Sequence, residues 1–271
     1  MSRDLLVLAV LTGLSGCMNL DWAILGGDPV DAYELPLELV PADQVAWVQF
    51  ETEDGRTLHG VWAHQDPPAP PLIWFHGNGS HLGTEDYWSR VEFLWALGTH
   101  DVFAFDYRGY GLSEGPADGG MLLYDGDAAV AAVSEATGVP PEGIPWVGLS
   151  LGGAVAVHTG TRLPAQSITT VDMFLSADRS SGDATGLDLP GGWLFSEHID
   201  NGEAIAAVQA PVFVIHGLDD TYVDPDYALE LYALAPDPKE LWRPEGVPHG
   251  GIEATIPEEY AARLGAWLGR W

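Results

Sequence analysis

The segment 145–153, Pro-Trp-Val-Gly-Leu-Ser-Leu-Gly-Gly, limits the possible folds of this chain more than any other stretch. Residues 144–147 form a short apolar run that predicts a strand, and residues 154–158 continue as a helix of mostly small side chains. Ser150 lies between them in a Gly-x-Ser-x-Gly turn, a context that forces a serine into a sharp elbow with its hydroxyl exposed. The neighbouring glycines supply the nearly side-chain-free positions that so tight a turn requires.

A second Gly-x-Ser-x-Gly match occurs at 111–115, so the pattern alone does not choose between two serines. Around Ser113 the preceding strand has ended several residues earlier, and Gly115-Pro116 opens a loop where an elbow needs a helix. The sequence therefore places the elbow at Ser150.

The alternation of apolar runs and helical patterns predicts the fold class. A hairpin signal, Asp54-Gly55, comes first. Strand-like runs follow at 72–75, 102–105, 144–147, 167–175, 211–215 and 240–243. Helical patterns lie between and after them, at 87–97, 124–137, 154–158, 227–235 and 258–268. Repeated β-α alternation predicts an α/β protein with a mostly parallel central sheet and helices on both faces.

The length of 271 residues fits one large domain, which we place at 45–271. Residues 17–44 contain scattered prolines, glycines and acids, which predict a tether and leader. The segment 177–202 breaks the alternation and contains Trp193 and Phe195. We expect it to form a short cap in which these two aromatic residues line an apolar substrate pocket. An ordinary surface loop that buries its aromatic side chains is the alternative.

The first 16 residues have the layout of a secretory signal peptide, with a charged start at Arg3, an apolar run and small residues before a cut. The apolar run at 5–14 is shorter than the about 20 residues that a transmembrane helix needs. Cys17 is the only cysteine, so the chain cannot form an intramolecular disulfide.

Residues 14–17, Leu-Ser-Gly-Cys, resemble the bacterial lipobox, although Asp4 departs slightly from its usual charged segment. The resemblance implies that Cys17 becomes the lipidated N-terminus of an exported lipoprotein in the cell envelope. Met18 favours the outer membrane, because an aspartate at this position is associated with retention in the inner membrane. An ordinary signal peptide followed by a chance cysteine is the alternative.

The charge balance limits the partners. The formal net charge is −30, and Lys239 is the only lysine. Nucleic-acid binding needs clustered Lys and Arg side chains to contact phosphates, so the sequence argues against a nucleic-acid partner. Anionic substrates would be repelled by the same charge. With 46% hydrophobic and 18% charged residues, the chain is expected to be ordered and globular.

A serine hydroxyl needs a base to take its proton, and that base needs a carboxylate to orient it. The developing oxyanion needs fixed N–H donors. The chain offers these groups at predicted strand ends, in the order Ser, Asp, His of an elbow enzyme. Asp219 and Asp220 follow the strand at 211–215, and His249 lies in a glycine-rich loop before the last helix. The run at 72–75 leads into His-Gly-Asn, whose backbone could present donors.

This ordered set of motifs resembles the α/β-hydrolase family, of the serine esterase and lipase type, over roughly residues 45–271. The segment 106–111, Asp-Tyr-Arg-Gly-Tyr-Gly, is similar to the loop after the fourth strand of that family. The acid of the family lies in a His-Gly-x-x-Asp-x-x-Val segment, which matches residues 216–223. The His-Gly-Asn loop gives the closest likeness to monoacylglycerol-lipase-like and membrane-tethered members.

The resemblance implies the α/β-hydrolase fold and a role for each matching residue. Ser150 would be the nucleophile, His249 the base and Asp220 the acid. The backbone N–H groups of Asn78 and Leu151 would be the oxyanion donors. Asp219 and the more distant Asp224 stay open as alternatives to Asp220. We expect structural roles for the remaining polar residues near strand ends and in the elbow helix: His76, His158, His216 and Arg108, the last paired with a local acid.

We therefore expect a serine hydrolase that cleaves a neutral, small-molecule carboxylic ester through an acyl-enzyme intermediate. Neither a metal-ligand spacing nor a dinucleotide-binding fingerprint is present, so no metal and no cofactor are expected. Thioesters and small amides or peptides remain alternative substrates, because the same three residues can cleave them. A non-catalytic, surface-anchored binding protein on the same scaffold is the alternative from another class. The oligomeric state is left open.

Overall fold

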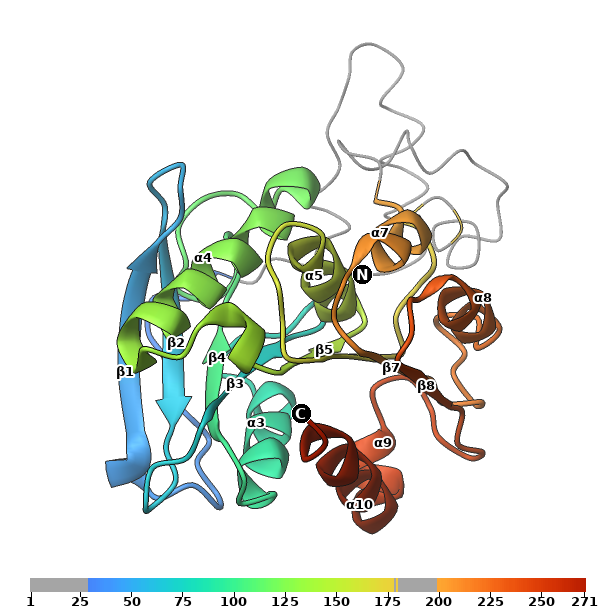
Figure 1. The fold of residues 1–271 in the computed structure, drawn as a ribbon. Coiled ribbons are helices and arrows are strands. Elements are labelled where there is room, and N and C mark those ends of the chain that lie inside the picture. Colours follow the sequence, from blue (N-terminus) through green and yellow to red (C-terminus); the bar gives the residue numbers. More distant parts are fainter. Residues whose placement is uncertain (1–28, 178, 180–198) are drawn as a thin grey trace, which may run out of the picture.

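A single sheet of eight strands organises the described part of the chain in the computed structural model, which comprises residues 29–177, 179 and 199–271 (Figure 1). The strand order is β1-β2-β4-β3-β5-β6-β7-β8. The strands are β1 Val45–Glu51, β2 Thr57–Ala63, β3 Pro71–Phe75, β4 Asp101–Phe105, β5 Trp146–Leu149, β6 Ile168–Val171, β7 Val212–Ile215 and β8 Lys239–Trp242. Strand β2 pairs antiparallel with β1 and β4, and all other pairs are parallel.

Helices cover both faces of the sheet (Figure 1). One face carries α4 Gly119–Thr137, α5 Leu151–Gly160, α7 Asn201–Ala207 and α8 Tyr227–Leu234. The other carries α3 Glu85–Ala96, α9 Ile252–Thr255 and α10 Pro257–Leu268. Two short 3-10 turns, Ala42–Gln44 and Pro141–Gly143, precede β1 and β5. The two faces have separate apolar cores, so the central strands are buried on both sides, as their continuous apolar sequences predict. The predicted α/β-hydrolase fold is confirmed.

The differences from the sequence prediction are local. Helix α4 begins at Gly119, five residues before the predicted start at 124, because the Asp118 side chain caps it by accepting from the Met121 N–H at 3.0 Å. The short helices α7 and α9 were not predicted, since each has too few residues to show a helical period. Strand β6 ends at Val171 instead of Leu175, because the next residue has a positive φ.

The predicted cap at 177–202 lies mostly outside the described residues, and so do Trp193, Phe195 and Cys17. Its last two residues form the first turn of α7, where the Asp200 side chain accepts from the Glu203 N–H at 2.9 Å.

Residues 29–44 pack against the domain. Tyr33 stacks on Trp47 with ring centroids 5.3 Å apart, and its hydroxyl donates to the buried Asp106 carboxylate. Further along, Glu92 of α3 accepts from three consecutive backbone N–H groups at residues 38–40. Within the described ranges, no helix combines the length and apolar character needed to cross a bilayer.

Candidate active site

Ser150 forms the turn between β5 and α5, with φ 52° and ψ −112°. A positive φ is strained for a residue with a side chain, and such strain persists only where the surroundings enforce it. Here the Ser150 N–H donates to the Val171 carbonyl at 2.8 Å, and the flanking glycines leave no room for a side chain. A Cβ on Gly148 would lie 2.4 Å from the Gly152 oxygen, and a Cβ on Gly152 would lie 2.0 Å from the Phe75 oxygen. The expected elbow is therefore present.

The loop that follows β3 lies against this elbow. A Cβ placed on Gly77 would be 3.5 Å from the Leu149 side chain, one residue before the serine. The Tyr110 hydroxyl donates to the Asn78 side-chain oxygen at 2.7 Å and ties the loop to the segment after β4. Leu151 is the first residue of α5, where backbone N–H groups have no intrahelical acceptor and the helix dipole favours negative charge. The two predicted oxyanion residues thus flank the elbow.

Asp220 and His249 are in direct contact. Asp220 Oδ2 lies 2.6 Å from His249 Nδ1, although 29 residues separate them in sequence. Asp220 Oδ1 accepts from the Tyr222 and Val223 N–H groups at 2.8 and 2.9 Å. The second ring on this carboxylate is His216, whose Nε2 lies 3.0 Å from Asp220 Oδ2. The carboxylate is therefore oriented by four contacts.

These contacts shift the pKa values of both partners. Burial alone would raise the pKa of the Asp220 carboxyl, but the hydrogen bonds from His216 and His249 outweigh it and hold that pKa well below its ordinary value. Burial would lower the pKa of His249, but the bond to Asp220 outweighs it and raises that pKa. A histidine beside an ionised carboxylate is suited to hold a proton transiently.

The structure separates Asp220 from the two alternative acids. Asp219 is exposed, and its Oδ1 accepts from the Gly246 N–H at 3.3 Å. Asp224 is also exposed and accepts from the Asp226 N–H at 2.9 Å. Of these acids, Asp220 is the one whose carboxylate contacts His249.

Asp172 is a buried acid in this region that the sequence reasoning missed. It follows β6 with a φ of 50°, and its carboxylate accepts from the Gly217 N–H at 2.9 Å and the Gly250 N–H at 2.7 Å. Burial raises its pKa, against the effect of nearby His216 and of these N–H donors. The signal available in the sequence was only its place in the predicted strand 167–175.

Asp172, Asp220 and His249 form a group that could hold a metal ion, with potential ligand atoms within 4.8 Å of one another. The sequence spacing did not indicate such a group. In the structure both carboxylates already accept hydrogen bonds from backbone N–H groups, and His249 Nδ1 contacts Asp220. These contacts join both carboxylates and His249 Nδ1 in a hydrogen-bonded acid–base cluster.

The loops carrying Ser150 and His249 meet beside the elbow. A Cβ on Gly250 would lie 3.6 Å from the Leu149 side chain. Among the residues that the structure describes, the Ser150 hydroxyl has no hydrogen-bond partner. Catalytic hydrogen bonds are often long before substrate binds. The arrangement thus brings the base next to the serine-bearing turn and leaves the hydroxyl without a competing acceptor.

The other singled-out residues support neighbouring loops. His76 is buried, stacks on Tyr107 at 4.1 Å between ring centroids, and has its pKa lowered to about 3 by burial. Arg108 binds Asp125 at 2.6 Å and Asp54 at 3.1 Å, which ties down the loop after β4 as expected. His158 lies within α5, and burial lowers its pKa to about 4.

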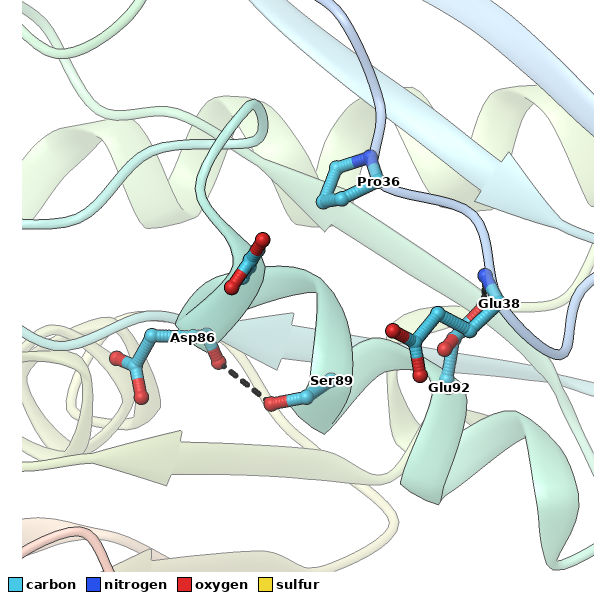
Figure 2. A pocket seen from close by; sticks show the side chains of 6 residues that line it. Pro36, Glu38, Asp86, Ser89 and Glu92 are labelled. Atoms are coloured by element: carbon cyan, nitrogen blue, oxygen red, sulfur yellow. Dashed lines mark hydrogen bonds between the residues drawn. The ribbon is translucent and has the colours of Figure 1, made fainter.

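A separate pocket of about 390 Å³ lies between residues 36–38 and the start of α3 (Figure 2). The pocket is lined by Pro36, Glu38, Glu85, Asp86, Ser89 and Glu92. This lining is acidic, and it contains none of the candidate catalytic residues described above.

Comparison with known proteins agrees with the fold. No family model matches the chain. It is 31% identical over 202 residues to the uncharacterized protein YfhR of Escherichia coli (strain K12), covering 72% of this chain and 69% of the relative. It is 29% identical over 226 residues to alpha/beta hydrolase domain-containing protein 17C of Xenopus tropicalis, covering 82% and 69%. The solved esterase Pf2001 of Pyrococcus furiosus has a TM-score of 0.72 and 26% identity, covering 89% and 98% of the two chains. The chain belongs to the α/β-hydrolase family.

Proposed function

We propose that this protein is a serine hydrolase that cleaves carboxylic esters through an acyl-enzyme intermediate. The observation that carries the proposal is the contact of 2.6 Å between Asp220 and His249. It lies at the carboxyl ends of the parallel strands, where Ser150 forms a strained elbow. Nucleophilic catalysis by serine needs this combination of an exposed hydroxyl, a base and an orienting acid.

In the proposed reaction, His249 Nε2 takes the hydroxyl proton as Ser150 Oγ attacks the ester carbonyl carbon. The Asp220 carboxylate holds the Nδ1–H and stabilises the imidazolium that forms. The backbone N–H groups of Leu151 and Asn78 stabilise the oxyanion, with the α5 dipole acting in the same direction. His249 then gives its proton to the leaving alkoxide, which departs as an alcohol. Water, deprotonated by His249, attacks the acyl-enzyme, and the acid is released as Ser150 regains its proton.

The expected substrate is a neutral ester with an acyl chain. The net charge of −30 disfavours anionic substrates, and the acids Asp219 and Asp224 are exposed beside the Asp220 turn. The esterase Pf2001 is 26% identical and covers 89% of this chain, which supports ester cleavage. The His-Gly-Asn loop supports, within this proposal, a likeness to monoacylglycerol-lipase-like members.

A panel of p-nitrophenyl esters graded by acyl length, with one thioester and one aminoacyl amide, tests the substrate class. We expect the esters to be hydrolysed fastest and Ser150→Ala to lower kcat by about 10³-fold or more. A fluorophosphonate probe should label the wild-type chain and not Ser150→Ala. A folded wild-type chain that neither reacts with the probe nor cleaves any substrate would be a binding protein, and an unaffected Ser150→Ala would refute the nucleophile.

We also propose that Cys17 carries a lipid that anchors the protein to the outer membrane. Eleven residues lie between Cys17 and Pro29, where the packed leader begins, so the anchor would hold the domain within at most about 40 Å of the bilayer surface. In a bacterial host, mass spectrometry of the mature N-terminus should show a diacylated Cys17. Release of the wild-type protein into the soluble fraction, with an unmodified cysteine, would contradict the anchor.

A further inference from the structure

The residue that follows His249 is held from two sides. The Gly250 N–H donates to Asp172 Oδ2 at 2.7 Å, and the Gly250 carbonyl accepts from Arg90 Nη2 at 2.6 Å. Gly250 has a φ of 59°, and a Cβ there would lie 3.0 Å from Arg90 Nη2. Gly250, in the loop that carries the base His249, is therefore bound on one side by the Asp172 carboxyl group and on the other by the Arg90 guanidinium.

Asp172 connects the loop of the acid to the loop of the base. Its second oxygen accepts from the N–H of Gly217, which begins the turn that carries Asp220, at 2.9 Å. The Asp172 backbone is itself fixed, since its N–H donates to the Ile215 carbonyl at 2.9 Å. A buried carboxylate bound to both loops fixes the distance between them.

Arg90 is equally well oriented. It is only 7% exposed and lies on α3, where its Nη1 contacts the Asp86 side chain and backbone oxygen, each at 2.6 Å. Its Nε lies 3.9 Å from the Glu253 carboxylate of α9. Burial raises the pKa of Glu253 to about 7. The contacts with Asp86 and Glu253 therefore fix the position of the Arg90 guanidinium that binds Gly250.

We propose that Arg90 and Asp172 are positioning residues for the reaction proposed above, which clamp Gly250 and so set the place of the His249 ring relative to Asp220 and Ser150. Because Arg90 and Asp172 carry charges of opposite sign, their electrostatic effects on the His249 ring are also opposite in sign. A shift of a base by as little as 1 Å can lower a rate about 100-fold.

The charged and titratable groups around His249 come from four elements. Asp220 and His216 face it from the β7 loop, and Asp172 faces it from the end of β6. Arg90 comes from α3 and is itself paired with acids on α3 and α9. The Tyr222 ring, 5.7 Å away between centroids, packs beside the histidine. Asp172 raises the pKa of His249 and Arg90 lowers it, after burial and the Asp220 bond have made their larger contributions.

The clamp is tested with Asp172→Asn and Arg90→Met, each of which removes one charge and one contact to Gly250. The acidic limb of the pH profile of kcat/KM should move to lower pH in Asp172→Asn and to higher pH in Arg90→Met. We expect kcat to fall about tenfold or more in both. Arg90→Lys keeps the charge, so its profile should keep the wild-type midpoint although kcat falls.

The matched controls are Asp127→Asn and Arg162→Met, which remove the same charges from an ion pair of 2.7 Å between α4 and the turn after α5. Both should keep kcat within about threefold of wild type and show no shift of the pH profile, because a partly exposed distant charge is screened by solvent.

An NMR titration of the full chain measures the titration midpoint of the His249 ring directly, without relying on catalysis. The His249 signal is assigned by its absence from the spectrum of His249→Gln. If the wild-type chain cleaves no substrate but the histidine titrates in opposite directions in the two variants, the clamp stands and the proposed reaction fails. Shifts of the same sign, no shift in folded variants, or unchanged kcat would overturn the clamp. If Asp172→Asn does not fold, Arg90→Met and Arg90→Lys decide by whether their midpoints differ.

Discussion

Replacing Asp220 with asparagine changes one atom of the proposed acid and tests the mechanism directly. Asp220 Oδ1 accepts from the Tyr222 and Val223 N–H groups, and an amide oxygen can keep both bonds. Oδ2 contacts His249 at 2.6 Å and His216 at 3.0 Å, and there the amide would present N–H donors. His249 Nδ1 would then have to accept, so its proton would move to Nε2, where the base needs a lone pair.

This tautomer change sets the expected magnitude. A histidine that carries its proton on Nε2 cannot remove the proton of Ser150, so kcat should fall about 10³- to 10⁴-fold, or roughly 4 to 5.5 kcal/mol. The fold should survive, because the two backbone bonds that shape the turn remain. The pKa of Asp220 is depressed in the folded state, so its carboxylate stabilises the native chain above the unfolded pKa and that contribution is lost as pH falls. Asp220→Asn should remove this part of the acid dependence of stability.

The assay compares kcat for a short-chain p-nitrophenyl ester, after the active fraction is titrated with a fluorophosphonate. Asp219→Asn is the matched control, since its carboxylate is exposed and accepts from the Gly246 N–H at 3.3 Å. It should keep kcat within about threefold. Retention of more than a tenth of wild-type kcat by folded Asp220→Asn, or an equal loss in Asp219→Asn, would refute the reasoning.

Four further predictions concern packing and buried charged groups, and guanidinium unfolding followed by tryptophan fluorescence checks each. Gly152→Ala places a methyl 2.0 Å from a β3 carbonyl oxygen and should destabilise the fold by at least about 2 kcal/mol; a smaller loss would contradict the tight elbow. Burial raises the pKa of Asp106 to about 7, above its unfolded value, so the Asp106 contribution to stability should be lost as pH rises from 4 to 7, and Asp106→Asn should remove this part of the pH dependence. Tyr33→Phe removes the hydroxyl that donates to the Asp106 carboxylate. It should lower the free energy of unfolding by about 2 kcal/mol at pH 9 and by less at pH 5.5. Equal losses at the two pH values would argue against an ionised Asp106. Arg108→Met leaves the Asp125 carboxylate buried without its cation and should cost about 3 kcal/mol at pH 8, less at pH 5, and a cost below about 1 kcal/mol would contradict the buried pair.

The sequence predicted the features that depend on local chemistry. Glycines around Ser150 are needed because neighbouring backbone approaches within 3 Å of where a Cβ would lie, and that requirement is visible as a short pattern. The strands were predictable because burial on both faces leaves continuous apolar runs. The choice of Asp220 over Asp219 came from the spacing of a resembling family, and the contact with His249 now separates them.

Features that depend on contacts distant in sequence were not predictable. Asp172 binds glycines 45 and 78 residues further along the chain, and no local pattern marks such a pair. His216 was expected to be only structural because it ends a buried strand, yet it contacts the proposed acid. A tether and a packed leader were expected at 17–44, but the partner of Tyr33, the buried acid Asp106, was not predictable. In each case a buried polar group finds its partner through the tertiary fold.

The topology explains why such a clamp is needed. Asn78, Ser150, Asp172, Asp220 and His249 follow β3, β5, β6, β7 and β8, five adjacent strands of the sheet. Strand β8 lies three interstrand spacings, about 14 Å, from β5. If His249 stayed directly above the end of β8, it would be too far from Ser150 for proton transfer. The β8 loop must therefore turn back across β7 and β6 and stay there. The bonds from Gly250 to Asp172 at the end of β6 and to Arg90 on α3 fasten the loop at this point of return.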